Sequence, residues 1–208
     1  MILVGQYDSP YVRRVAITLH HYGIAFTRNA ISVFGNADKM ARINPLVRIP
    51  SLILDDGEVL IDSAAILDHL DEVVGERALT PRSGAARRRV LQLMAAATGS
   101  IDKAGAVVYE RHFHAPQGVN ADWLARCLGQ LRGGLAYLDA QMTGSWLAPD
   151  RFTQADVTVG ALAGYLKLRV SEIDLARDYL RLARHSDRCE ALPAFVQARP
   201  GPNEVMPA

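Results

Sequence analysis

The chain has 208 residues, of which 50% are hydrophobic and 22% are charged, and its formal net charge at pH 7 is +1. This length suffices for one large domain or two small ones with buried cores. The balanced charge gives no support to a nucleic-acid surface or a polybasic membrane anchor. No apolar run approaches the roughly 18 residues that a membrane span needs. Neither nucleic acid nor a membrane is therefore an expected partner.

The two cysteines, Cys127 and Cys189, form neither a CxxC motif nor a zinc-binding spacing. No cluster of histidines and carboxylates suggests a metal site, so we expect no metal cofactor. The N-terminus enters an apolar strand directly, with no charged leader and no small-residue cleavage site. We therefore expect a reduced, cytoplasmic protein.

Strand and helix signals alternate over the first part of the chain, in the order βαβαββα. Apolar periodicity, Gly and Pro punctuation and an Asp-Gly turn predict strands, helices and one hairpin. The predicted strands cover about 2–6, 25–31, 49–54 and 58–61, and the predicted helices cover about 10–22, 36–43 and 64–74. This order predicts an α/β domain.

The second part of the chain has helical periodicity throughout. Gly, Pro and Ser residues interrupt the pattern around 75–84, which favours an inter-domain linker. We place an α/β domain at 1–76, a linker at 77–85 and an all-α domain at 86–208. Within that second domain, helical patterns cover about 85–112, 121–142, a segment that starts at Thr153, and two shorter stretches within 174–198.

The junction between the first strand and the first helix is a candidate site. Ser9 lies at the predicted N-cap and Pro10 at the first helical position, where proline is tolerated. A hydroxyl and free N–H groups at a positive helix end suit a thiolate or a carboxylate. Taken alone, the same pattern is also that of a simple helix cap.

Five short motifs, in order and over nearly the whole chain, resemble those of the glutathione transferase superfamily. They are Ser9–Arg13, Asn44–Leu52, Asp62–Ile66, Phe152–Asp156, and Leu192–Phe195 with Arg199-Pro200. The chain is similar to bacterial, cytosolic members of the serine type. The resemblance implies a thioredoxin-like first domain, an all-α second domain and glutathione as co-substrate. It also implies a homodimer.

By this resemblance the protein is an enzyme that conjugates glutathione to a small apolar electrophile. Ser9 would donate a hydrogen bond from its hydroxyl to the thiolate of glutathione, which is the nucleophile. Tyr7, near the end of the first strand, is a competing donor, and Tyr11 lies on the first helical turn as a further candidate. For both tyrosines the alternative is packing with an exposed hydroxyl.

The resemblance assigns the rest of glutathione to three further segments. A cis peptide bond between Ile49 and Pro50 would present the backbone of Ile49 to the cysteinyl part of glutathione. Ser63 would bind the γ-glutamyl carboxylate, and Asp62 would bind the α-ammonium group. The same two residues also suit a helix cap. Candidates for the glycyl carboxylate are Arg48 and Lys39.

The helical domain is expected to line the pocket for the second substrate. Tyr109 is the main candidate there, and Arg111, His112 and His114 lie nearby at the end of the same predicted helix. The electrophile itself does not follow from the sequence, because scattered helical residues build such pockets and the fold does not fix them.

Val47 bears on alternative functions, and Thr153 and Asp156 bear on structure. Val47 stands where many family members have glycine, and a bulkier residue there narrows the glutathione site. A non-catalytic binding or regulatory protein therefore remains an alternative, as does a glutathione-dependent reductase or isomerase. Thr153 and Asp156 fit a capping box, which we interpret as structural.

Overall fold

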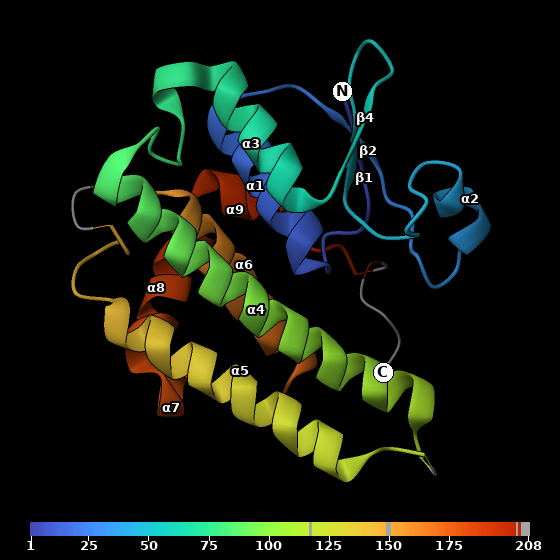
Figure 1. Ribbon diagram of the computed structural model, residues 1–208, viewed down its shortest axis with the longest axis vertical. Helices are drawn as coiled ribbons and strands as arrows, with labels where there is room; N and C mark the ends of the chain where they lie inside the picture. Colours follow the sequence, from blue (N-terminus) through green and yellow to red (C-terminus); the bar gives the residue numbers. More distant parts are fainter. Residues whose placement is uncertain (117, 149–150, 203, 205–208) are drawn as a thin grey trace. The chain divides into compact units, whose positions relative to one another are not determined.

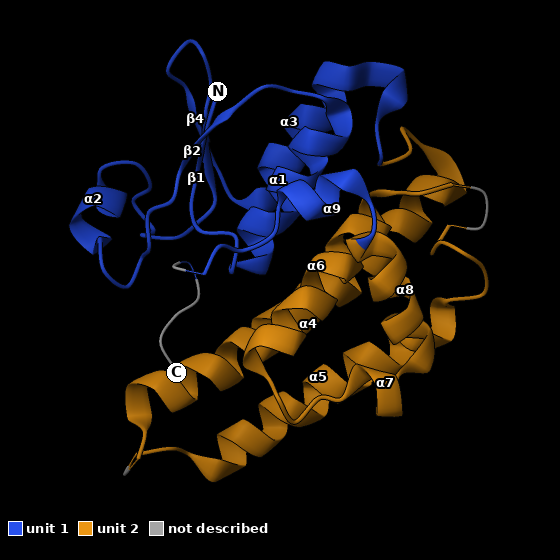
Figure 2. Cartoon of the chain, turned by 180° about the vertical axis from the view of Figure 1, so that it is seen from behind, with its two compact units in different colours: residues 1–79, 191–208 blue, residues 80–190 orange. Residues whose placement is uncertain are grey.

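The computed structural model describes residues 1–116, 118–148, 151–202 and 204 (Figure 1). The described chain divides into two compact units (Figure 2). The first consists of residues 1–79 together with the segment from 191 onward, and the second of residues 80–190. The predicted boundaries placed this last segment in the helical domain, whereas its described residues pack with the first unit.

The first unit contains a four-stranded mixed sheet with the strand order β2-β1-β3-β4. Strand β1 pairs in parallel with β2 and antiparallel with β3, which in turn pairs antiparallel with β4. The parallel pair requires a crossover, and α1 supplies it. The strands are β1 (Ile2–Val4), β2 (Thr27–Asn29), β3 (Ser51–Ile53) and β4 (Val59–Ile61).

Helix α1 is the central helix of this unit and packs against α3 and α9. It begins after Ser9 and ends at Gly23, whose φ of 69° is the left-handed conformation that glycine adopts readily. The helices of the unit are α1 (Pro10–Tyr22), α2 (Ala37–Ala41), α3 (Ser63–Val74), the 3-10 turn η1 (Gly75–Arg77) and α9 (Pro193–Gln197). The predicted βαβαββα order is confirmed.

The core of the first unit lies between the sheet and this helix layer. Fully buried apolar side chains from β1, β3, α1 and α3 fill it: Leu3, Val4, Leu52, Val15, Leu19, Ile66 and Leu70. Burying each such side chain stabilises the fold by roughly 1.5–3 kcal/mol. This packing fixes the N-terminal ends of α1 and α3, where the predicted site residues lie.

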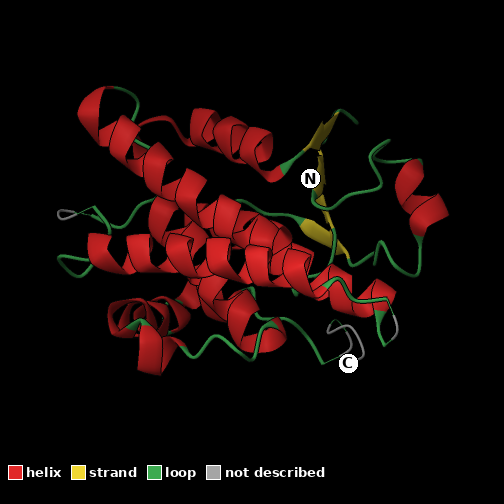
Figure 3. Ribbon diagram, turned by 60° about the horizontal axis from the view of Figure 1, so that its bottom comes forward, coloured by secondary structure: helices red, strands yellow, loops and turns green. Residues whose placement is uncertain are grey.

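Helices are the regular elements of the second unit, as predicted (Figure 3). Helix α4 packs along both α5 and α6, and α6 also contacts α8. Twelve of the 16 residues of α6 are buried, so this helix forms the centre of the unit. The helices are α4 (Gly84–His114), α5 (Ala121–Gln141), α6 (Gln154–Arg169), α7 (Leu175–Asp178) and α8 (Leu180–Glu190). No helix in the described part of the chain is long and apolar enough to cross a membrane.

Helix α6 begins with the predicted capping box. The N–H of Thr153 donates to Oδ2 of Asp156 at 2.8 Å, and the N–H of Leu147 donates to Oδ1 of Asp156 at 2.9 Å. Both Thr153 and Asp156 are completely buried. The carboxylate of Asp156 therefore ties the preceding loop to the helix that organises the second unit.

Candidate functional site

A short turn connects β1 to the N-terminus of α1. Gly5 has a φ of 130°, and a Cβ at this position would lie only 2.6 Å from Cγ2 of Val12, so the approach requires glycine. The turn closes where the N–H of Ser9 donates to the carbonyl oxygen of Gln6 at 3.2 Å. This geometry places Ser9 directly at the start of the helix.

Ser9 is a half-exposed N-cap with extended backbone angles of φ −71° and ψ 121°. Its Oγ accepts from the N–H of Val12 at 3.4 Å, which is long for a hydrogen bond. Because Oγ acts here as an acceptor, its own O–H proton remains available to a second group. The positive end of the helix dipole adds to this donor, so the position favours an anion.

Tyr7 lies two residues earlier in a different environment. Its side chain is 1% exposed, and no described residue hydrogen-bonds its hydroxyl. Burial raises the pKa of Tyr7 to about 12. The guanidinium of Arg28 lies 3.4 Å from the centre of the phenol ring and is paired with Glu204. The structure thus buries Tyr7, while Ser9 keeps partial access to solvent.

The loop before β3 contains the cis bond between Ile49 and Pro50 that the resemblance implied. The buried side chain of Asn44 holds this loop, since its Nδ2 donates to the carbonyl oxygen of Arg48 at 2.9 Å. Ile49 is half-buried and Arg48 is exposed. Val47 has a φ of 50°, a left-handed conformation that costs a β-branched residue energy. Lys39 is exposed on α2, outside this loop.

At the N-terminus of α3, Asp62 and Ser63 divide two tasks. Asp62 is the N-cap, with a φ of 69°, and its Oδ1 accepts from the N–H of Ala64 at 2.7 Å. Ser63 is the first helical residue and is 2% exposed. Because Asp62 provides the cap, the hydroxyl of Ser63 is not needed for that purpose.

Arg14 is a further candidate site residue, to which the sequence motifs assigned no role. This arginine is 2% exposed, and its Nη2 donates to Oγ of Ser63 at 2.6 Å. Its guanidinium also lies 5.6 Å from the centre of the Tyr11 ring. Arginine only donates, so Oγ of Ser63 is the acceptor and its O–H proton is available to another group. A carboxylate at this helix end would meet a hydroxyl donor, the helix dipole and a nearby buried cation. The one sequence signal for this role is that Arg14, a charged residue, lies between the apolar residues Val12 and Val15 of α1.

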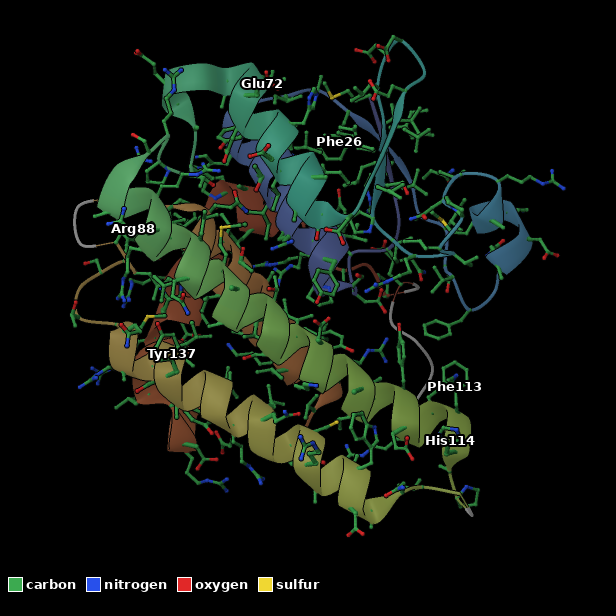
Figure 4. The ribbon with its side chains drawn as sticks, viewed as in Figure 1. Phe26, Glu72, Arg88, Phe113, His114 and Tyr137 are labelled. Carbon is green, nitrogen blue, oxygen red and sulfur yellow. The ribbon has the colours of Figure 1, made fainter. Side chains whose placement is uncertain are left out.

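The predicted residues for the second substrate lie near the C-terminal end of α4, in the second unit. Tyr109 is 48% exposed, and its ring contacts that of Phe113 edge-on at 5.9 Å. Arg111 is paired with Glu172, and His112 and His114 are exposed. Figure 4 shows Phe113 and His114 at this end of the helix. Within the described residues, no group of three or more His, Cys, Asp or Glu side chains lies close enough together to hold a metal ion.

Family models agree with this division of the chain. The model of the glutathione S-transferase N-terminal domain matches residues 3–78, and that of the C-terminal domain matches residues 121–188. An uncharacterized GST-like protein of Escherichia coli, YibF, is 30% identical over 169 residues, which cover 81% of this chain and 83% of that protein. The chain belongs to the glutathione S-transferase family.

Two further similar proteins have different named activities. A maleylacetoacetate isomerase of Pseudomonas aeruginosa is 29% identical over the full length of both chains. A glutathione S-transferase of Methylobacterium radiotolerans, solved in complex with glutathione sulfonate, is 32% identical with a TM-score of 0.90. The match covers 96% of this chain and 94% of that structure. Transferases and isomerases are thus both among the similar proteins.

Proposed function

We propose that this family member binds glutathione on its first unit and conjugates it, through its sulfur, to small apolar electrophiles. The observation that carries the proposal is the pair of helix N-termini with Ser9 and Ser63, the latter backed by the buried cation of Arg14. The thiolate and the carboxylates of glutathione are anions, and both kinds of anion suit such helix ends. The structure solved with glutathione sulfonate supports the same ligand.

The proposed binding mode assigns one part of glutathione to each segment. The γ-glutamyl carboxylate would accept from the hydroxyl and N–H of Ser63, and its ammonium group would pair with Asp62. The cysteinyl backbone would pair with Ile49 next to the cis proline in the manner of an added strand. The glycyl carboxylate would meet Arg48, with Lys39 as the alternative. Tyr11 would contact the ligand from the first turn of α1.

Ser9 would act as a hydrogen-bond donor and not as a base. A free thiol has a pKa of roughly 8.5 and is mostly protonated at neutral pH. A hydroxyl donor and a helix end both stabilise the thiolate, so they lower this pKa. The thiolate then attacks the electrophilic carbon, the carbon–sulfur bond forms, and the leaving group departs with its electron pair. Exchange through an enzyme disulfide would need a protein thiolate, whereas both cysteines are buried in the second unit.

A glutathione-dependent isomerase is the second candidate. It is favoured by the full-length similarity to a maleylacetoacetate isomerase. The same thiolate would add to a cis double bond and leave again after rotation, so glutathione would be regenerated. Consumption of glutathione therefore separates the two reactions.

The proposal is tested by titration with glutathione, followed by assays with an aryl halide and with a cis-enedione acid. Transfer predicts saturable binding and loss of one glutathione per product. Product formed from the cis substrate without loss of glutathione would favour the isomerase. Saturable binding with neither reaction would favour a binding protein, and no saturable binding would contradict the proposal.

We further propose that the protein is a cytoplasmic homodimer, as the family resemblance implies, with Tyr109 lining the pocket of the electrophile. The two free cysteines fit a reducing compartment. Light scattering over micromolar concentrations tests the dimer, and a constant monomer mass would contradict it. Tyr109→Ala should raise the KM for the electrophile and leave the affinity for glutathione unchanged.

A further inference from the structure

The C-terminal segment of the chain returns to the turn that precedes Ser9. Oε1 of Glu204 accepts from the backbone N–H of Tyr7 at 3.3 Å and is paired with Arg28 of β2. Glu204 is only 9% exposed. A carboxylate 197 positions away in the sequence thus holds the turn between β1 and α1.

The segment that carries Glu204 is itself fixed to the first unit. Oε2 of Glu204 accepts from the N–H of Gly201 at 2.7 Å, which closes a short loop. Two earlier residues of the segment contact Arg13 of α1. The carbonyl oxygen of Ala198 accepts from Nε of Arg13 at 3.1 Å, and the ring centre of Phe195 lies 5.7 Å from the guanidinium. Glu204 therefore holds the turn from a segment that is itself fixed to the first unit.

The turn in question is the one that sets the position of Ser9. Its closing hydrogen bond joins the N–H of Ser9 to Gln6, and Tyr7 lies between them. The N–H of Tyr7 has its bond to Glu204, and the Tyr7 ring lies under Arg28, the ion-pair partner of the same carboxylate. Both the backbone and the side chain of Tyr7 are thus held through one acidic residue.

We propose that Glu204 is a positioning residue for Ser9, which fixes the hydroxyl and the helix N-terminus against the sulfur of glutathione. This inference rests on the proposed function. A misplacement of the order of 1 Å at a reacting group can lower a rate about 100-fold. Apart from Tyr11 on the first turn of α1, the groups proposed to bind the rest of glutathione, such as Ile49 and Ser63, lie on other segments. Loosening the turn therefore affects thiolate formation more than binding of the peptide.

The test compares Glu204→Ala and Glu204→Gln with the wild-type protein over the full chain. We expect Glu204→Ala to lower kcat about tenfold, to raise the apparent pKa of the bound thiol, and to leave the KM for glutathione within about twofold. Glu204→Gln keeps one acceptor oxygen but not the charge, so it should retain part of the lost activity. A residue that only supported the fold would not separate kcat from KM, nor shift the thiol pKa.

Asp71→Asn is the matched control, because it makes the same carboxylate-to-amide change in the same unit. Asp71 of α3 contacts the hydroxyl of Tyr22 at the opposite end of α1. The Asp71→Asn substitution should leave kcat and the pKa of the bound thiol unchanged. Wild-type values of kcat and thiol pKa in Glu204→Ala would overturn the inference, as would an equal effect of the control. A wild-type protein that binds no glutathione would instead overturn the proposed function, and this inference with it.

Discussion

Helices α1 and α3 of the first unit and α6 of the second unit all begin with a capping side chain, but the caps differ in exposure and in the hydrogen bonds that they make. In the second unit, the cap of α6 is closed: both oxygens of Asp156 accept backbone N–H groups, and Thr153 and Asp156 are fully buried. In the first unit, the caps Ser9 and Asp62 are partly or fully exposed at the starts of α1 and α3. A capping sequence is therefore compatible with a purely structural role and with a binding role.

The two helix ends of the first unit also differ from each other. At α3, Asp62 provides the cap and leaves the hydroxyl of Ser63 for a ligand, with Arg14 fixing that hydroxyl as an acceptor. At α1, Ser9 is both the cap and the proposed donor. At α1 and α3 a serine hydroxyl is the acceptor and the cap residue is half-exposed or exposed, whereas at α6 the Thr153 hydroxyl donates to Asp156 and both residues are buried. These two features distinguish a candidate binding end from a structural one.

The largest expected effect is on turnover at the α1 end. Replacing Ser9 by alanine removes the proposed donor to the thiolate, and loss of one such donor lowers kcat about 100-fold to 1,000-fold. The loss of the long cap bond costs at most about 1 kcal/mol of stability. Steady-state kinetics with an aryl halide measure the first effect and urea unfolding the second. A variant with wild-type kcat would show that the α1 cap is only structural.

At the closed end of α6 the expected effect is on stability alone. Asp156→Ala leaves the N–H groups of Leu147 and Thr153 and the Thr153 hydroxyl without their acceptor, so we expect the free energy of unfolding to fall by about 3 kcal/mol. Asp156→Asn, which keeps one acceptor oxygen, should lose less. Urea unfolding measures both variants. Affinity for glutathione in the folded fraction should be unchanged, and a specific loss of affinity would contradict the contrast between the two units.

At the α3 end the expected effect is on affinity. Arg14→Met removes the cation behind Ser63, and a hydrogen bond that involves a charged group contributes about 1.5–3 kcal/mol. We expect the dissociation constant of glutathione to rise about tenfold or more, as measured by calorimetry. Binding of an analogue that lacks the γ-glutamyl carboxylate should change little.

Arg13 offers a matched control for that substitution. It is the adjacent buried arginine of the same helix, but it donates to Ala198 and not to Ser63. Arg13→Met should leave the affinities for glutathione and for the analogue unchanged or lower both by the same factor. If both variants changed the ratio of the two affinities equally, Arg14 would support the helix and would not bind the carboxylate.

The smallest expected effect is at Tyr7. The pKa of its buried phenol is raised to about 12, so the group stays protonated, and Tyr7→Phe removes no titrating group near neutral pH. We expect kcat to stay within about twofold of the wild type, with an unchanged pH profile. A larger loss than in Ser9→Ala would transfer the role of thiol activator from Ser9 to Tyr7.

Much of the fold follows from local sequence signals. Ser9-Pro10 and Gly23 mark the ends of α1 because proline is tolerated at the first helical position and glycine adopts a left-handed conformation. The Asp-Gly turn identifies the β3–β4 hairpin in the same way. The cis bond at Pro50 was predictable only from the family resemblance, since no local pattern dictates it.

The features that local signals missed depend on contacts between distant segments. The contact of Arg14 with Ser63 spans 49 positions, and that of Glu204 with Tyr7 spans 197. Neither residue has a periodicity or spacing that names its partner. The return of the C-terminal segment to the first unit was missed for the same reason, because its short helix α9 resembles any other helical stretch.

The proposed mechanism depends on the N-terminus of α1, where Ser9 would stabilise the thiolate of glutathione. The most direct measurement is the ultraviolet absorbance of the thiolate of bound glutathione as a function of pH, in the wild-type protein and in Ser9→Ala. We expect an apparent pKa of the bound thiol clearly below the roughly 8.5 of a free thiol in the wild type, and a return toward that value in the variant. The same pKa in both proteins would contradict it.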